Sequence, residues 1–471
     1  MFPLFAETLI AKKLSTFVFP EDLLDRRQVI SKWQGLFTDK LEAELQPNIH
    51  EFLHDLFVDV LGYGSPFGDE TWELELVPQA SLGLFGEGLC HPLVKIDWDA
   101  SYPAENNHAY EWIVRINSMG IYLLHGQMPS IFCEQFLWSN VTELFNWQKF
   151  YLLLCRRTLL PRSLGAKSHT LLLFEESQEL ENEYLRQIYT QVVTTRDRLT
   201  KDFRHRLSQA EVPDQPTVEN LADEKALKLI YRILFITYAQ SWQLLPPRLI
   251  GDAYDFYNPY QEQPVWCNYK AIFHGLRSGN SRFKELLPTY VCSIFAPDLI
   301  LDEMIFVGDE LCRQLKEIAK FNVRENLTLG AWNCLLHSLL PPPRKRPAKY
   351  PCKYLGTAQS VIAKLQVHPN LDVNNLIIFD RQCRSGTLLV VAFFYLLQHT
   401  NSTAEFIMTN CLYGTDPDPQ AVAMTKLNLW LAGLTHCAPV TALDQHIYHQ
   451  PEVTNQFLWQ DDHKLVIELQ K

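Results

Sequence analysis

Two short loops in the last quarter of the sequence carry residues suited to binding a nucleoside cofactor. The first loop, 380–386, reads DRQCRSG, so it begins with Asp380 and ends with Gly386. The second loop contains Asp416 and Asp418. An adenosine ribose needs a first loop whose backbone approaches the ligand closely and, after the next strand, a carboxylate that accepts from the ribose hydroxyls. The two loops together therefore predict a site for a ribose-containing cofactor.

The same residues also fit a purely structural role. Asp-Pro-Asp-Pro at 416–419 is a common sequence for a turn and for the N-cap of a helix. A single glycine in the first loop is a weak signal by itself. Only the order and the spacing of the two loops favour a binding site over a pair of ordinary turns.

Alternating strands and helices are expected around these loops. The sequence predicts buried strands at 375–380 (NLIIFD) and within 408–416 (MTNCLYGTD), and helices at 387–399 and 418–433. The order strand, loop, helix, strand, loop, helix is typical of a doubly wound parallel α/β sheet, in which ligands bind at the carboxyl ends of the strands. Both loops would then lie at one edge of the sheet.

The regions before this sheet differ in the spacing of their apolar residues. Residues 1–170 combine a helical opening with short strand-like runs, including WIVRINSMGIYLLHG (112–126), which reads as strand, turn and strand. In 171–340 apolar residues recur about every 3.6 positions, which predicts helices. The Pro-rich, basic stretch 341–354 predicts a linker that opens the last region, 341–471. The expected fold is α/β with a large helical middle.

Composition excludes several classes of protein. Lys and Arg number 42 against 54 Asp and Glu, a net charge of −12, so a basic surface for nucleic acid has to be local. The 11 Cys include no C-x-x-C pair, which argues against a disulfide framework or a structural zinc site. No signal-peptide pattern opens the chain, and the longest apolar run, 388–397, is half of the ~20 residues that a membrane span needs. We therefore expect a cytoplasmic protein with no membrane partner.

The two loops and three upstream segments resemble the adenine-N6 DNA methyltransferases, in particular the single-chain type IIG restriction–modification enzymes. The family's motif I reads D-P-A-C-G-S-G where this chain has DRQCRSG at 380–386. Its motif II reads G-V-D-I-D-P-x-A-V where this chain has GTDPDPQAV at 414–422. The segments 225–247 and 287–306 resemble its helical region, and 112–126 resembles a strand pair of its nuclease-like region.

This resemblance implies a fold, a cofactor and a partner. It implies a degenerate nuclease-like α/β region at 1–170, a helical domain at 171–340 and the first half of a Rossmann-like methyltransferase sheet at 341–471. The implied cofactor is S-adenosylmethionine, and the implied partner is DNA. The residues that motifs I and II place at the cofactor are Asp380, Cys383, Ser385, Gly386, Asp416 and Asp418.

Motif I departs from the family at positions next to the cofactor. Arg381, Gln382 and Arg384 replace Pro, Ala and Gly. Arg384 matters most, because it places a side chain where the backbone has to lie against the methionine part of the cofactor. Alternatively, its charge could pair with the carboxylate of the cofactor. We expect S-adenosylmethionine to bind weakly or not at all.

A run of basic residues around the expected linker is the first candidate for DNA contact. Such a run can follow a phosphate backbone through charge-assisted contacts, and a solvated linker is the alternative interpretation. No comparable run is evident elsewhere in this acidic sequence. The candidate residues are Arg344, Lys345, Arg346, Lys349 and Lys353.

The nuclease-like region lacks the residue pair that orients a metal and water in this family. The family places an acidic residue two positions before a strand Lys, whereas here Leu93 precedes Lys95. Four acids could still assemble a site in space, with scattered surface acids as the alternative. They are Asp69, Glu70, Glu73 and Asp97. We expect no metal site and no nuclease activity.

The acceptor motif of the family does not occur in the sequence. Adenine-N6 transfer uses N/D-P-P-Y/F to bind the amine and stack on the flipped base, and no such tetrapeptide precedes Lys471. Asn258-Pro259-Tyr260 lacks the second Pro and is expected to be a turn, so we expect no catalytic residue. Three hypotheses stay open. The chain is a degenerate methyltransferase, a non-enzymatic DNA- or protein-binding scaffold, or half of a split enzyme whose C-terminal partner chain carries the acceptor motif.

Overall fold

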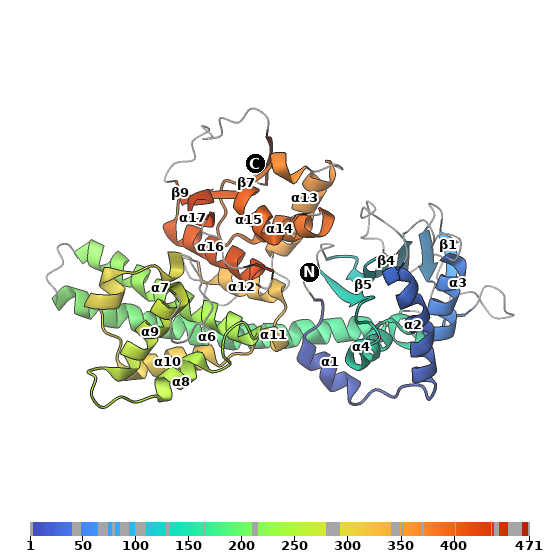
Figure 1. Cartoon of the computed structure of the whole chain (residues 1–471), viewed down its shortest axis with the longest axis horizontal. Coiled ribbons are helices and arrows are strands. Elements are labelled where there is room, and N and C mark those ends of the chain that lie inside the picture. The colour runs from blue at the N-terminus through green and yellow to red at the C-terminus, as the bar shows by residue number, and fades with distance from the viewer. Residues whose placement is uncertain are drawn as a thin grey trace. The chain divides into compact units, whose positions relative to one another are not determined.

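The computed structural model divides the chain into two compact units, Met1–Leu180 and Glu181–Lys471. The long helix α6 (His169–Gln209) contains the boundary between them (Figure 1). The three regions expected from the sequence stay a prediction. The structure describes residues 3–39, 49–64, 74–77, 81–84, 94–98, 110–128, 132–163, 165–209, 215–278, 293–340, 349, 353–368, 372–400, 402–434, 436–437, 442–450 and 464–469.

The first unit is built around a six-stranded mixed sheet. Its strands are hydrogen-bonded in chain order, and neighbours are antiparallel except β3 and β4, which are parallel. The strands are β1 (Leu74–Val77), β2 (Ser81–Leu84), β3 (Val94–Trp98), β4 (Trp112–Asn117), β5 (Gly120–His125) and β6 (Cys133–Leu137). The helices are α1 (Glu7–Leu14), α2 (Leu23–Asp39), α3 (Ile49–His54), the π-helix η3 (Asp55–Val60), α4 (Leu144–Leu154) and α5 (Arg156–Leu159).

The hairpin of β4 and β5 shows how the sequence specifies a turn. The side chain of Asn117 accepts hydrogen bonds from the backbone N of Met119 at 2.9 Å and of Gly120 at 3.2 Å, which closes the turn. A Cβ at Gly120 would lie 2.5 Å from the carbonyl oxygen of Phe136 on β6, so only glycine fits there. The strand, turn and strand expected at 112–126 are confirmed.

The second unit begins with a helical region. In the described part of 181–340 the structure contains helices and no strand, which confirms the expected helical middle. No helix among the described residues is both long and apolar enough to cross a membrane. After α6 follow α7 (Gln215–Ser241), α8 (Leu249–Asp255), α9 (Pro264–Ser278), η5 (Ser293–Phe295), η6 (Leu299–Met304), α10 (Asp309–Ala319), α11 (Val323–Asn326) and α12 (Leu329–Ser338).

A buried arginine forms an ion pair that connects α7 to the segment 293–304. Arg232 is 1% exposed, and its guanidinium donates to the carboxylate of Asp302 at 2.7 Å. It also donates to the carbonyl oxygens of Ile294 at 3.0 Å and Ala296 at 3.1 Å. These acceptors offset the desolvation of the buried charge and hold η5 against α7.

The second unit ends in a four-stranded parallel sheet with the order β10-β7-β8-β9. The chain adds β8 and β9 on one side of β7 and then returns to add β10 on its other side. Such a reversal is a topological switch point, where open parallel sheets bind ligands beside the carboxyl ends of their strands. The elements are α13 (Lys353–Gln366), η7 (Val373–Asn375), β7 (Leu376–Asp380), α14 (Thr387–His399), α15 (Ala404–Asn410), β8 (Leu412–Asp416), α16 (Pro419–Gly433), α17 (Leu443–His446), β9 (Ile447–His449) and β10 (Leu465–Glu468).

This sheet differs from the expectation in two details. The strand expected within 408–416 starts only at Leu412, because the residues before it form the helix α15. The side chain of Thr403 caps that helix by accepting from the backbone N of Phe406 at 3.2 Å. The sheet also has two more strands, β9 and β10, than the two expected. The expected helices at 387–399 and 418–433 are confirmed within one residue.

Candidate functional site

Asp380 ends β7 in the interior of the second unit. Its side chain is 0% exposed, and its Oδ1 accepts from the backbone N of Gln382 at 3.3 Å. Its Oδ2 has no hydrogen-bond partner among the described residues. Burial, with a smaller contribution from the charges of Asp416 and Glu468, raises the pKa of Asp380 to about 7. A buried carboxyl group with a free oxygen is an acceptor that a ligand can use.

The loop after β7 keeps a glycine-type backbone although one glycine of the family pattern is replaced. The φ angle is +48° at Arg384 and +75° at Gly386, both in the left-handed region that L side chains disfavour. A Cβ at Gly386 would lie 3.1 Å from the Cα of Thr425 on α16, so the loop touches that helix closely. The side chain of Arg384 is exposed. The backbone at Arg384 is therefore strained, whereas a glycine at this position would adopt the same φ angle without strain.

Asp416 connects the two loops. Its Oδ2 accepts from the backbone N of Arg384 at 2.9 Å, and its Oδ1 accepts from the backbone N of Asp418 at 3.0 Å. The backbone N of Cys383 adds a second link by donating to the carbonyl of Thr415 at 3.0 Å. Each carboxylate oxygen can accept a further bond, so the role at a ribose expected of Asp416 is compatible with these contacts. The Cys383 side chain is buried, which raises the pKa of its thiol and keeps it neutral.

Asp418 caps helix α16. Its side chain accepts from the backbone N of Gln420 at 2.9 Å, and Pro419 occupies the first turn of the helix. The structural interpretation of the Asp-Pro-Asp-Pro sequence is therefore confirmed for this residue. Asp418 is half-buried, and it also lines a pocket shared with α7.

Ser385 is hydrogen-bonded to three residues that the sequence analysis did not single out. Its Oγ lies 3.2 Å from Nδ1 of His337 on α12 and 3.1 Å from Oγ1 of Thr387. Its carbonyl oxygen accepts from the side chain of Asn428 on α16 at 2.7 Å. All four side chains are buried. Residues distant in sequence thus fix the middle of the loop, and no local motif signals this contact.

A second unexpected contact lies at the end of β10. The guanidinium of Arg381 forms an ion pair with the carboxylate of Glu468. The backbone N of Leu469 donates to the carbonyl of Phe379 at 2.9 Å, which continues the pairing of the strands past β10. The first loop is therefore bound on both sides, by Asp416 from β8 and by Glu468 from β10.

Of the basic run expected to contact DNA, the structure describes two residues. Lys349 is exposed, and Lys353 is the first residue of α13. Arg344, Lys345 and Arg346 lie outside the described residues. The expected contact at this run stays a prediction.

The last part of α6 presents a further basic surface. Arg198, Lys201 and Arg204 are exposed at a spacing of three, which places them on neighbouring positions of the helix surface. Arg204 forms an ion pair with Glu219 on α7 at 3.4 Å, and no ion pair forms at Arg198 or Lys201 among the described residues. This surface could not be predicted from the sequence, because acidic residues are interspersed along the same helix.

The structure describes little of the expected nuclease-like site. Lys95 is buried in β3, and Asp97 follows two residues later in the same strand. The other residues considered for this site, Asp69, Glu70, Glu73 and Leu93, lie outside the described residues. The turn expected at 258–260 is confirmed, since the side chain of Asn258 accepts from the backbone N of Tyr260 at 3.1 Å.

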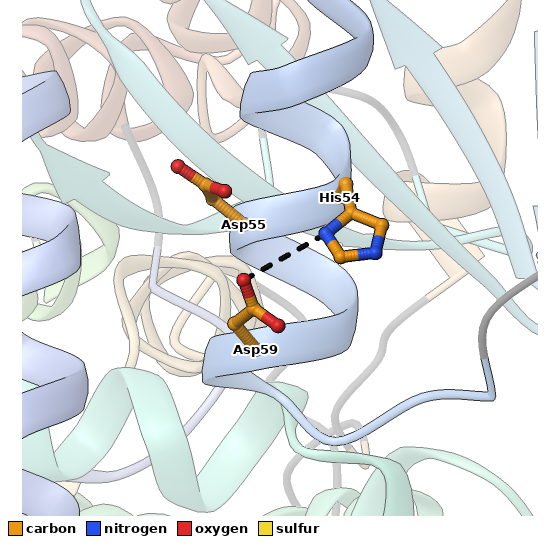
Figure 2. Close-up of side chains that lie close together, drawn as sticks. All are labelled: His54, Asp55 and Asp59. Carbon is orange, nitrogen blue, oxygen red and sulfur yellow. Dashed lines mark ion pairs between the residues drawn. The ribbon is translucent and has the colours of Figure 1, made fainter.

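Figure 2 shows three side chains on α3 and η3 whose potential ligand atoms lie within 4.8 Å of one another. His54 Nδ1 and Asp59 Oδ2 are 3.7 Å apart. The third member, Asp55, already accepts from Trp33 Nε1 at 2.8 Å and from Lys32 Nζ at 3.4 Å. These protein donors account for the carboxylate of Asp55 without an ion, so we assign no metal to the cluster.

No protein-family model and no curated protein sequence matches the chain. Among solved structures, one similar chain is the type IIL restriction–modification enzyme MmeI in complex with DNA, with a TM-score of 0.35, 10% identity and coverage of 59% of this chain and 40% of that one. The type IIG restriction endonuclease BpuSI has a TM-score of 0.23 and 11% identity, covering 76% and 37%. The DrdV–DNA complex has a TM-score of 0.27 and 10% identity, covering 88% and 38%. The chain spans about two fifths of the length of each.

Proposed function

We propose that the second unit binds S-adenosylmethionine and that the protein is related to the adenine-N6 DNA methyltransferases of restriction–modification systems. The observation that carries this proposal is the hydrogen bond from the backbone N of Arg384 to Oδ2 of Asp416, at 2.9 Å. It joins the loop of motif I to the loop of motif II at the carboxyl ends of two neighbouring parallel strands, β7 and β8. Binding one nucleoside with both loops requires this adjacency.

The residues at this edge of the sheet fit such a cofactor. Asp416 would accept from the ribose hydroxyls, and the backbone of 381–386 would face the methionine part. The Oδ2 of Asp380, which has no hydrogen-bond partner among the described residues, would accept from the cofactor's ammonium group. When bound, the cofactor supplies an electrophilic methyl group. Cys383, Ser385 and Gly386 would act by shaping the loop, because their side-chain positions are buried and packed against it.

Arg384 is the reason to expect low affinity. Crowding or losing one charge-assisted contact costs about 1.5 to 3 kcal/mol, or roughly 10- to 100-fold in affinity. Calorimetry of the full chain should show S-adenosylmethionine binding weaker than micromolar, and Asp416→Asn should abolish what remains. Asp372→Asn is a matched control, because Asp372 also accepts from a backbone N two residues later, at 3.0 Å. Micromolar binding that survives Asp416→Asn would contradict the proposed site.

We propose further that these 471 residues alone transfer no methyl group to DNA. The sequence contains no N-P-P-Y motif, so nothing of that kind would offset the few kcal/mol that flipping a base costs. Tritium incorporation into a mixed-sequence duplex should stay at background. Incorporation after adding a chain that carries N-P-P-Y would favour the split enzyme. DNA binding with no incorporation under either condition would favour a scaffold, and incorporation by this chain alone would contradict the proposal.

DNA contact is proposed at one of two basic surfaces, the run at 344–353 or the exposed face of α6. Phosphate contacts would make binding weak, non-specific and steeply dependent on salt. A low-salt gel shift of a triple Ala variant at 344–346 should lose the signal if the run carries the contact. If the gel-shift signal is lost instead in the double variant Arg198→Ala, Lys201→Ala, the DNA contact lies on α6. A shift unchanged in both variants would refute both surfaces.

A further inference from the structure

A pocket of about 510 Å³ lies between α7, η5 and the N-terminal end of α16. Asp223, Leu227 and Tyr231 line it from α7, Ile294 lines it from η5, and Asp418 lines it from the cap of α16. Of the cofactor residues expected from the sequence, the pocket contains only Asp418. The pocket therefore adjoins the second loop and shares Asp418 with it, while its other lining residues lie outside both loops.

Tyr231 contributes a buried hydroxyl to the wall of this pocket. Tyr231 is 3% exposed, and its hydroxyl has no hydrogen-bond partner among the described residues. Burial raises the pKa of this phenol, and the charges of Asp418 and Asp223 raise it further, so the hydroxyl stays protonated. Since a buried hydroxyl without a partner is unfavourable, a group that occupies the pocket and bonds to this oxygen would be stabilising.

The charges around the pocket are predominantly negative. Asp223 accepts from the hydroxyl of Thr200 and from the side-chain amide of Gln420, both at 3.3 Å, and neither donor is charged. Asp418 accepts from the backbone N of Gln420. No ion pair forms at Asp223 or Asp418 among the described residues.

Two cations near the pocket form ion pairs with acids outside it. Lys228 lines the pocket, but its Nζ lies 2.9 Å from the carboxylate of Asp298. Arg196 lowers the pKa of Tyr231; its Nη2 lies 3.3 Å from the carboxylate of Asp197, and its buried Nε has no hydrogen-bond partner among the described residues. Among the described residues, the carboxylates of Asp223 and Asp418 therefore have no cationic partner, and they lie in the same pocket as the protonated Tyr231.

We propose that this pocket binds a small organic cation, an amine with an apolar body. The ammonium would lie between Asp223 and Asp418 and within reach of the Tyr231 hydroxyl, and the apolar body would pack on Leu227 and Ile294. A bare divalent metal fits less well, because such ions take six to eight oxygen ligands and gain nothing from apolar walls. The proposal does not depend on S-adenosylmethionine binding at the neighbouring loops.

Calorimetry on the full chain tests this with two probes of similar shape, phenethylamine and its neutral counterpart 2-phenylethanol. Phenethylamine should bind at least tenfold more tightly, since only it can pair with the carboxylates. Asp418→Asn keeps a helix-capping side chain but removes the charge, and Tyr231→Phe removes only the hydroxyl. Each should weaken phenethylamine about tenfold, whereas Asp372→Asn should leave it unchanged.

Several outcomes would overturn the proposal. The wild-type protein alone can refute the preference for a cation, whether or not the variants fold. It would do so if the two probes bind with equal affinity, or if phenethylamine does not bind at millimolar concentration. Magnesium binding that is lost in Asp418→Asn would assign the cavity to a metal. Displacement of phenethylamine by S-adenosylmethionine would make the cavity part of the cofactor site. Independent binding of the two would support a separate site.

Discussion

Replacing Arg384 with glycine is the most direct test of how the first loop limits the protein. At φ +48° the residue has a left-handed backbone, which costs an L residue about 1 to 2 kcal/mol and glycine almost nothing. The glycine variant also has a more flexible unfolded chain, and this lowers the free energy of unfolding by about 0.4 to 1 kcal/mol. The free energy of unfolding should therefore rise by about 0.5 to 1 kcal/mol.

The same substitution should also change ligand binding. Removing the side chain frees the loop to lie against the methionine part of S-adenosylmethionine, so affinity should rise by about 10- to 100-fold. Gln243→Gly is the matched control, because Gln243 is exposed, has φ +58° and lies outside both loops. Urea unfolding should show a similar gain for both variants, whereas calorimetry should show tighter binding only for Arg384→Gly.

Two results would refute this reasoning. If Arg384→Gly gains stability as the control does but binds S-adenosylmethionine no more tightly, the side chain does not obstruct the cofactor. If wild type binds better than the variant, the guanidinium pairs with the cofactor's carboxylate, which is the alternative that the sequence left open. Either result would redirect attention from the loop backbone to the charge of the side chain.

Three further predictions concern stability and cleavage. Gly386→Ala should lower the free energy of unfolding, measured in urea, by about 2 to 4 kcal/mol, because a Cβ there meets the backbone of Thr425. Gly165→Ala is the control: Gly165 has φ +79° in open space, so its substitution should lower the free energy of unfolding by only about 1 kcal/mol. Equal losses in the two variants would contradict the close contact at Gly386. Because burial raises the pKa of Asp380 from 3.8 to about 7, the stability that its protonated carboxyl provides is present below about pH 4 and lost as pH rises through 7. Asp380→Asn should therefore gain up to about 4 kcal/mol over wild type between pH 4 and pH 8, and a pH-independent difference in urea unfolding would argue against the shift. Plasmid incubated with magnesium or manganese should stay supercoiled, and nicking that disappears in Lys95→Ala would reverse the expectation of no nuclease activity.

The sequence predicted those elements whose signals are local. The apolar run of β7 and α14, the turn at Asn117 and the cap at Asp418 each depend on neighbours within a few residues, so they can be recognised without the fold. The hydrogen bonds of Ser385 with His337 and Asn428 form between helices that meet only after folding. In the sequence, single residues on buried helix faces cannot be distinguished from ordinary core residues. For the same reason the pocket lined by Tyr231 could not be predicted from the sequence.

The position of β10 has a practical consequence for engineering the protein. Leu469 is hydrogen-bonded to Phe379, and Glu468 is paired with Arg381, so the polypeptide leaves the sheet beside the first loop. A peptide or reporter group fused after this strand would start next to the proposed cofactor residues and would need no long linker to reach them. A fluorophore attached there would lie beside the first loop, and a fused segment carrying an acceptor motif would begin at the edge of the sheet that holds the two proposed cofactor loops.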